Sequence, residues 1–319
     1  MNSRATRGRL APSPTGGLHV GHARTFLIAW LLARQNGGSV VLRVEDLDAS
    51  RVRPEAADSM LDDLGWLGLE WDEGPDRCGP HSPYVQSERI PLIMSTLEVL
   101  KAKELAYPCV CTRAEIARAA SAPHAGEEGP SYPGTCSGKR ADDAASLQDR
   151  PFAWRFRVPR GWVEWDDLVL GRQSRDPSAV GGDFIVARHL HGPAYQLAVV
   201  HDDATMAINQ VVRGDDLLPS TPRQILLYRA LGWEPPRFGH VPLVLDPDGK
   251  RLAKRDGSIR LAALREAGVN AERLIGHLAA SIGITLNAET ATPADLIAAF
   301  DLRRMPRYPW IFDAGRVIR

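Results

Sequence analysis

The sequence has no excess of charge of either sign, because 39 lysines and arginines are balanced by 39 aspartates and glutamates. Without an overall basic field, a nucleic acid would have to bind to a local patch, so composition neither supports nor excludes such a partner. The hydrophobic content of 44% is ordinary for a globular protein, and 319 residues suffice for one large domain or two modest ones.

Long hydrophobic runs are also missing from the sequence. The apolar run from Thr25 to Ala33 is too short to span a bilayer, and the polar, Arg-rich N-terminus lacks the apolar core of a signal peptide. We therefore expect a cytoplasmic location and no membrane partner. Cysteine is scarce, and four such residues do not suggest a disulfide framework in a reducing compartment, which leaves metal binding or free thiols.

The segment from Arg9 to Arg34, RLAPSPTGGLHVGHARTFLIAWLLAR, is predicted to form a strand, a turn and a helix. Two prolines and two glycines interrupt regular structure before an apolar pattern of helical period begins at Leu18. Strand signals return after Gly37 and Gly38 in the run SVVLRVED, so the three elements predict a βαβ unit of a parallel sheet.

Two histidines mark the start of the predicted helix. His19 and His22 are three residues apart and therefore neighbours on one face, at the helix end where free N–H groups and the macrodipole favour an anion. Gly21 between them lets a flat ligand such as a purine lie against the backbone. The pattern indicates a phosphate site, although capping, a surface position or metal binding would also explain two histidines here.

Arg9 lies at the end of the first predicted strand and Glu45 at the end of the second, and parallel sheets bind ligands at the carboxyl ends of their strands. The two side chains are therefore expected to face one crevice. They either form an ordinary ion pair or bind the two ends of an amino acid, with Arg9 on a carboxylate and Glu45 on an ammonium group.

Three cysteines have the spacing of a metal site. Cys109 and Cys111 are separated by a loop rich in glycine and proline from Cys136, and three thiolates would fill three corners of a tetrahedral zinc site. His124 in that loop is one candidate for the fourth ligand. Small core residues are the alternative interpretation of these cysteines.

The string PSPTGGLHVGHARTFL resembles the "HIGH" signature of the class I aminoacyl-tRNA synthetases in its glutamyl form. The resemblance continues through YVQSERIPLIMSTLEVLKAKELAYPCVCT, and RLAKR at 251–255 resembles the "KMSKS" loop, with Arg251 in place of the first lysine and Ala253 in place of the serine. It spans nearly the whole chain and is closest to the glutamyl-Q tRNA(Asp) synthetases, the truncated relatives of glutamyl-tRNA synthetase. The segment VRGDDLL favours this branch weakly.

This resemblance implies an α/β fold with a Rossmann-type parallel sheet. Its two halves are expected at residues 1–105 and 181–258, with an inserted zinc-binding, acceptor-type subdomain at 106–180 and a helical segment at 259–319. Only about 64 residues follow Arg255, too few for an anticodon-binding domain. Antiparallel strands are expected in the insert at FAWRFRVP and GWVEWDDLVLG, and further strands at Leu197 to Val200 and Gln210 to Val212.

The reaction implied by the resemblance has two steps, in which ATP carrying Mg²⁺ and L-glutamate form glutamyl-adenylate and the glutamyl group then passes to queuosine in tRNA(Asp). A monomer is expected. The alternatives are a shortened conventional glutamyl-tRNA synthetase that charges the tRNA 3′ end, a noncatalytic glutamate- or nucleotide-binding module, and a zinc-organised RNA-binding protein.

The resemblance also assigns residues to each part of the reaction. Catalysis falls to His19, His22 and Lys254, and ATP binding to these three with Gly21 and Arg251. The residues expected to bind L-glutamate are Arg9, Leu10, Ala11, Pro12, Ser13, Glu45, Tyr195 and Arg213. One structural Zn²⁺ per chain is expected on Cys109, Cys111, Tyr132 and Cys136, so the resemblance prefers Tyr132 to His124.

Overall fold

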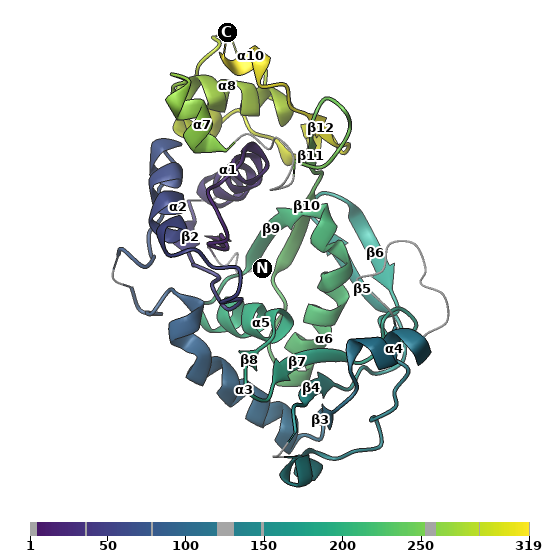
Figure 1. Ribbon diagram of the computed structural model, residues 1–319. Helices are drawn as coiled ribbons and strands as arrows, with labels where there is room; N and C mark the ends of the chain where they lie inside the picture. Colours follow the sequence, from purple (N-terminus) through teal and green to yellow (C-terminus); the bar gives the residue numbers. More distant parts are fainter. Residues whose placement is uncertain are drawn as a thin grey trace.

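The computed structural model describes residues 5–35, 37–77, 79–119, 131–147, 150–252, 260–286 and 288–318. Figure 1 shows a parallel core in the middle of an elongated molecule, with the C-terminal helices at one end and an antiparallel sheet at the other. Among the described residues, no helix combines the length and the apolar character needed to cross a membrane.

Four parallel strands form the centre of the fold. Strand β1 (Arg7–Leu10) pairs with β2 (Ser39–Leu42), and β9 (Gln210–Gly214) pairs with β10 (Arg237–Val241). The two pairs meet where the Asn209 N–H donates to the Arg7 carbonyl over 3.1 Å. The parallel pairing confirms the expected βαβ unit and brings the ends of β1, β2 and β9 to one edge.

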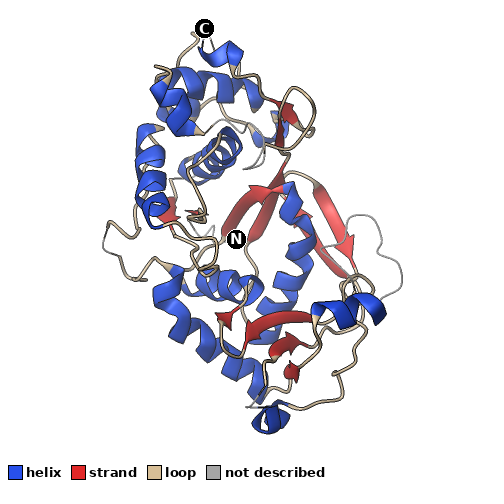
Figure 2. Cartoon of the chain, viewed as in Figure 1, coloured by secondary structure: helices blue, strands red, loops and turns tan. Residues whose placement is uncertain are grey.

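Helix α1 (Val20–Arg34) connects β1 to β2 and is buried along almost its whole length, as expected for a crossover helix packed between layers. The other helices of the core are α2 (Pro54–Trp66), η1 (Gln86–Arg89), α3 (Ile90–Ala102), α5 (Tyr195–Thr205), η3 (Asp215–Ser220) and α6 (Thr221–Leu231). Figure 2, in the same view as Figure 1, shows α1 and α2 on one side of the central strands and α6 on the other.

The strand that we expected at Leu197 to Val200 is wrong, because these residues lie inside α5. A short apolar run is compatible with a buried strand and equally with a buried helix, and the sequence pattern does not separate the two. The eight residues from Gln196 to Asp203 are all buried, the polar ones included, so the polar residues of this helix do not mark a solvent-exposed face. Tyr195 therefore approaches the sheet edge from a helix N-terminus.

The inserted region is antiparallel, as expected. Strands β3 (Ala106–Cys109), β4 (Ala153–Phe156), β7 (Phe184–Arg188) and β8 (Gly192–Pro193) form one sheet, and β5 (Val163–Asp167) and β6 (Gly171–Arg175) form a separate hairpin. The short helices α4 (Arg113–Ala119) and η2 (Ala141–Leu147) accompany them. The subdomain boundary at residue 180 stays a prediction; the four-stranded sheet itself ends at Pro193.

The C-terminal region is largely helical, with α7 (Leu261–Glu266), α8 (Ala271–Ser281), α9 (Pro293–Leu296), η4 (Leu302–Arg304) and α10 (Gly315–Ile318). One strand pair also occurs there, between β11 (Val244–Leu245) and β12 (Trp310–Ile311). The fully buried Arg24 of α1 donates to Ser281 Oγ over 3.1 Å and to the Pro242 carbonyl over 2.8 Å, which joins this region to the core.

Candidate active site

A cavity of about 520 Å³ opens at the carboxyl ends of β1, β2 and β9. The Arg43 N–H donates to the Leu10 carbonyl and the Glu45 N–H to the Pro12 carbonyl, each over 2.9 Å, so the two segments after β1 and β2 stay side by side. The predicted site residues that line the cavity are Arg9, Ala11, Pro12, Ser13, His19, Gly21, His22, Glu45, Tyr195, Arg213 and Arg251.

Leu10, a predicted glutamate-binding residue, is not among the residues that line this cavity, because it is fully buried in the hydrophobic core. Its backbone carbonyl holds the Arg43 N–H, so its contribution is to the sheet. Lys254 lies outside the described residues, as do Ala253 and Arg255.

The two histidines cap α1 and line the cavity at the same time. The Gly21 N–H donates to His19 Nδ1 over 3.1 Å, the His19 N–H donates to His22 Nδ1 over 3.3 Å, and the rings stack with centroids 3.7 Å apart. A Cβ at Gly21 would lie 2.9 Å from the His19 ring, so a larger residue there would require the ring to shift. Because both Nδ1 atoms accept, each neutral ring carries its proton on Nε2.

Arg43, which was not predicted as a site residue, occupies the centre of a buried charge network. Its guanidinium is fully buried and donates to Asp203 over 2.7 Å and to Glu45 over 2.9 Å. Arg9 lies 3.7 Å from the same Asp203. Of the two interpretations of Arg9 and Glu45, the direct ion pair is therefore absent from the contacts of the described residues, and Arg43 with Asp203 links them instead.

The network continues to Asp202, which is fully buried. Arg89 donates to Asp202 over 2.7 Å and Arg43 lies 3.9 Å from it. Three arginines thus meet three carboxylates, and the ion pairs within this group balance. Burial raises the pKa of Glu45, while the charges of Arg43 and Arg9 oppose the rise. An arginine inside the apolar run SVVLRVED was the sequence signal, since a buried guanidinium requires partners.

Arg213 lies on the cavity wall and is 5% exposed. It donates through Nε to His240 over 3.1 Å, through Nη1 to Gln224 over 2.9 Å and through Nη2 to Thr221 over 2.8 Å. Burial lowers the pKa of Arg213, and the side chains of the described residues that accept these three hydrogen bonds are neutral. A buried cation with neutral partners at a cavity wall is suited to an anionic ligand group.

Tyr195 and Arg251 complete the described part of the cavity. Tyr195 is 39% exposed and faces the same space as Arg213. Arg251 is paired with Asp216 of η3 over 2.7 Å, so the described start of the "KMSKS"-like loop is tied to the cavity rim. Asp216 belongs to the VRGDDLL segment that distinguished the branch in the sequence.

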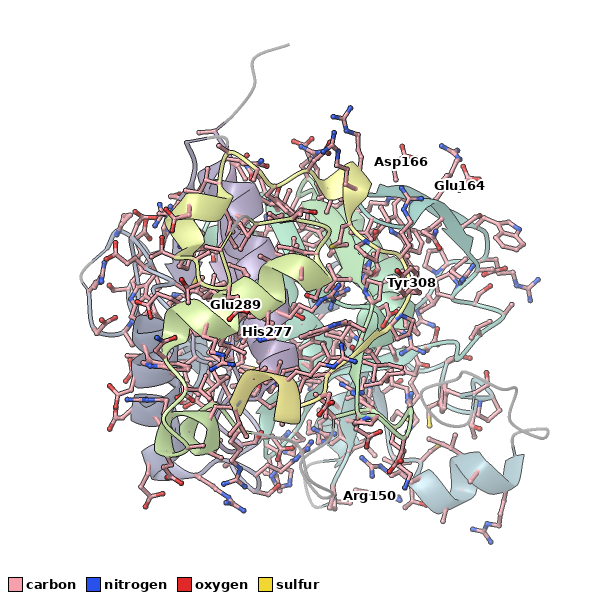
Figure 3. All side chains as sticks on the ribbon, turned by 90° about the horizontal axis from the view of Figure 1, so that it is seen from above. Arg150, Glu164, Asp166, His277, Glu289 and Tyr308 are labelled. Atoms are coloured by element: carbon pink, nitrogen blue, oxygen red, sulfur yellow. The ribbon has the colours of Figure 1, made fainter. Side chains whose placement is uncertain are left out.

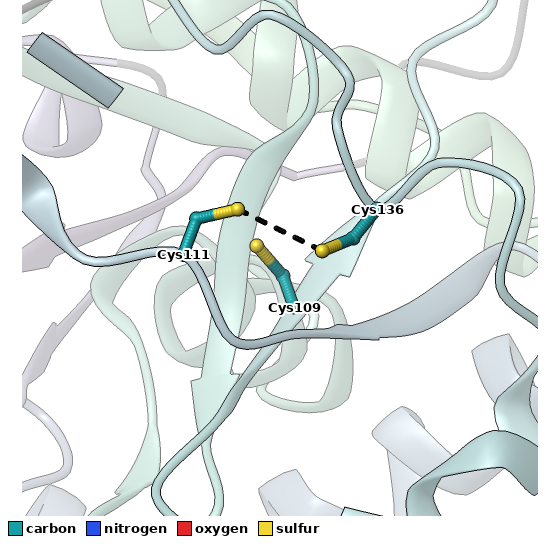
Figure 4. Close-up of side chains that lie close together, drawn as sticks. All are labelled: Cys109, Cys111 and Cys136. Atoms are coloured by element: carbon teal, nitrogen blue, oxygen red, sulfur yellow. Dashed lines mark hydrogen bonds between the residues drawn. The ribbon is translucent and has the colours of Figure 1, made fainter. Parts of the chain in front are cut away.

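The three cysteine sulfurs converge at the end of β3, as Figure 4 shows, and lie within 4.8 Å of one another. Tyr132 is the fourth group at the cluster: its hydroxyl lies 3.4 Å from Cys109 Sγ and accepts the Cys136 N–H over 2.8 Å. Three thiol sulfurs and a phenol oxygen converge here, and soft thiolate ligands suit zinc. The cluster is therefore able to hold a metal. His124 lies outside the described residues.

Comparison with known proteins agrees with this architecture. The family model "tRNA synthetases class I (E and Q), catalytic domain" matches residues 5–317. A glutamyl-Q tRNA(Asp) synthetase of Symbiobacterium thermophilum is 51% identical over 95% of this chain and 94% of its own length. The corresponding protein of Nitratidesulfovibrio vulgaris is 47% identical, over 97% and 96%.

A solved structure of a glutamate tRNA ligase from Elizabethkingia meningosepticum, in complex with its amino acid, superimposes with a TM-score of 0.86 at 30% identity. It covers 98% of this chain, which in turn covers 68% of that ligase. The expected fold class is thereby confirmed. The chain belongs to the class I aminoacyl-tRNA synthetases of the glutamyl and glutaminyl type, in the glutamyl-Q tRNA(Asp) synthetase family, and is a ligase of that family.

Proposed function

We propose that this enzyme activates L-glutamate with ATP and transfers the glutamyl group to queuosine in the anticodon loop of tRNA(Asp). The observation that carries the glutamate half is Arg213, a buried guanidinium with neutral partners beside a charge network that is already balanced. A ligand with a carboxylate supplies the missing negative charge. The tRNA half is supported by the names of the relatives.

In this proposal Arg9 and Arg213 bind the side-chain carboxylate of the substrate, and Glu45 binds its ammonium group. Glu45 retains accessible surface although Arg43 holds one of its oxygens, so a carboxylate oxygen faces the cavity. Glutamine would place a neutral amide against the arginines and leave a buried cation uncompensated. A site built for a charged partner rejects such an analogue strongly.

The ATP side of the cavity is the N-terminus of α1. His19, Gly21 and His22 would bind the nucleotide there, and Arg251 and Lys254 would stabilise the charge that develops on the leaving pyrophosphate. A glutamate carboxylate oxygen attacks the α-phosphorus, the bond to the bridging oxygen breaks, and pyrophosphate leaves. Mg²⁺ carried by ATP would neutralise phosphate charge, so the protein mainly has to hold the two reactants in line.

Cys109, Cys111, Tyr132 and Cys136 would hold one structural zinc ion in this proposal. The contacts of Tyr132 with Cys109 and with the Cys136 backbone support its place as the fourth ligand. With every ligand position filled by protein, the ion would fix the end of β3 to the segment that carries Tyr132 and Cys136 and leave no position for substrate.

The first test is glutamate-dependent exchange of labelled pyrophosphate into ATP, measured with and without tRNA. We expect exchange both with and without tRNA. It should be lost in Lys254→Ala but retained in the matched variant Lys250→Ala, which changes an exposed lysine that precedes the same loop. Exchange that requires tRNA would favour a shortened conventional glutamyl-tRNA synthetase. No exchange under either condition would favour a binding module.

The second test addresses the acceptor. Transcribed tRNA(Asp) without queuosine and native tRNA(Asp) with it are incubated with labelled glutamate, ATP and the enzyme. We expect label only on the queuosine-containing tRNA, and we expect it to survive removal of the 3′-terminal adenosine. Label on both tRNAs that is lost with that adenosine would contradict transfer to the base.

A further inference from the structure

Arg213 donates a hydrogen bond to a histidine that is not among the residues lining the cavity. His240 of β10 is fully buried, and its Nε2 lies 3.1 Å from Arg213 Nε and 3.0 Å from Thr221 Oγ1. Because Nε of a guanidinium always carries a hydrogen, Nε2 of His240 must present its lone pair to Arg213. A proton at this position would point one N–H group at another.

Asp167 sets the proton position on this histidine. One carboxylate oxygen, Oδ1, accepts the backbone N–H groups of Val169, Leu170 and His240 over 3.0, 3.0 and 3.1 Å. The other, Oδ2, lies 2.5 Å from His240 Nδ1. A carboxylate that accepts three N–H groups is favoured in its ionised form, so the His240 contact requires a proton on Nδ1.

The strand pattern shows that Asp167 is placed for this contact. Along β5 the side chains alternate, and Glu164 and Asp166 are exposed while Asp167 is 5% exposed. Figure 3 shows Glu164 and Asp166 at the periphery of the molecule. The Leu168 N–H donates to the Phe238 carbonyl over 2.8 Å, which fixes the end of β5 against β10.

We propose that Asp167 and His240 are a positioning pair for the substrate carboxylate: Asp167 holds His240 as the neutral Nδ1–H tautomer, and its Nε2 orients the Arg213 guanidinium toward the cavity. The inference rests on the proposed function for the identity of the ligand. Neither residue touches the substrate. The pair makes the inserted hairpin, which is remote in sequence from the parallel core, a determinant of amino-acid affinity.

The tautomer is measured directly on the full-length protein labelled with ¹⁵N-histidine. Long-range ¹H–¹⁵N spectra distinguish a protonated from an unprotonated ring nitrogen, and the signals of His240 are identified by their loss in His240→Gln. We expect Nδ1 protonated and Nε2 unprotonated in the wild type. A proton on Nε2 would overturn the proposal without reference to any activity.

The functional readout is the Kd for glutamate by calorimetry, with the KM for ATP in the exchange assay. Asp167→Asn places an amide N–H group where the carboxylate accepted the Nδ1 proton of His240, which favours the tautomer protonated on Nε2. We expect the affinity for glutamate to fall about 10- to 100-fold. The KM for ATP should stay unchanged. The matched control is Asp166→Asn on the same strand, whose side chain is 82% exposed and whose glutamate affinity should equal that of the wild type.

Two conservative variants of His240 separate positioning from packing. The oxygen of glutamine in His240→Gln can take the place of Nε2 and accept from Arg213, whereas the shorter His240→Asn reaches the position of Nδ1 and leaves Arg213 Nε without its acceptor. We expect glutamate affinity to be higher in His240→Gln than in His240→Asn. Equal affinities in the two variants, or wild-type affinity in Asp167→Asn, would overturn the proposal.

The two proposals fail in different ways. If the wild type binds no glutamate, the proposed function is wrong, and the spectra still report whether Asp167 and His240 hold the expected tautomer. If the wild type binds glutamate and Asp167→Asn binds it equally well, the proposed function stands and the positioning pair does not.

Discussion

Replacing Arg43 by methionine should destabilise the protein by about 3–5 kcal/mol, the usual cost of leaving a buried charge partner unpaired. The two closest contacts of Arg43, at 2.7 and 2.9 Å, each correspond to a gross attraction of about 6 kcal/mol at an effective dielectric constant of about 20. Much of this attraction only offsets the cost of burying the charges. After the substitution Asp203 and Glu45 remain buried without their main cation, while methionine preserves the packing volume.

The measurement is urea unfolding at pH 7, with the slope of the transition checked for constancy. Arg172→Met is the matched control: Arg172 also faces two carboxylates, Glu164 at 2.8 Å and Asp166 at 3.9 Å, but its side chain is 66% exposed. That variant should lose less than about 1 kcal/mol. Equal losses in the two variants would refute the reasoning, because burial would then have no effect on the strength of these pairs.

The pH dependence of Arg43→Met provides a second check on the same prediction. Arg43 is the main charge that opposes the effect of burial on the pKa of Glu45. Without it, that pKa in the folded variant should rise further above its unfolded value. The folded state then binds more protons than the unfolded state between these two pKa values, and the stability deficit should shrink as the pH is lowered through that range. A deficit that grows on acidification from pH 7 to pH 5 would contradict this account.

Three further predictions concern other parts of the molecule. Cys109→Ser should lower the zinc content measured by mass spectrometry relative to Cys78→Ser, and unchanged zinc would exclude the proposed site. Gly276→Ala should destabilise the protein by about 1–3 kcal/mol in urea unfolding, since a Cβ there would collide with the Glu289 carbonyl, whereas Gly138→Ala meets open space. Burial lowers the pKa of His201, so unfolded protein binds the proton first and stability should fall below about pH 6.5; the fall should be smaller in His201→Asn.

Much of the site was predictable because its residues follow strands with a clear pattern. Arg9 lies near the carboxyl end of β1 and Glu45 lies shortly after β2, and the rule that parallel strands end at one edge was sufficient to bring them together. His19 and His22 were predicted to be neighbours at a helix start from their spacing, and in the structure His19 is the N-cap of α1 and His22 lies in its first turn. These predictions needed only short-range regularities.

The parts that could not be predicted depend on burial rather than on local pattern. Nothing near Arg43 in the sequence indicates that its partners are Asp202 and Asp203, about 160 residues later. The run from Leu197 to Val200 looks like a strand because both faces of α5 are buried there, so its apolar residues are consecutive and do not form the stripe that identifies most helices. His240 was missed for the same reason, since a buried histidine in an apolar strand shows its role only through Arg213 and Asp167.

The contacts that join β1 to β9 also determine when the cavity is formed during folding. Arg9 donates to the Val212 carbonyl, 203 positions later, and Arg7 donates to the Asn209 side chain, 202 positions later. During synthesis β1, α1 and β2 leave the ribosome long before β9. The contact between Arg43 and Asp203 therefore cannot form until much more of the chain has been made. Contacts of such separation form late because loop closure must come first. Ligand binding should therefore appear together with the slowest refolding phase and not before it.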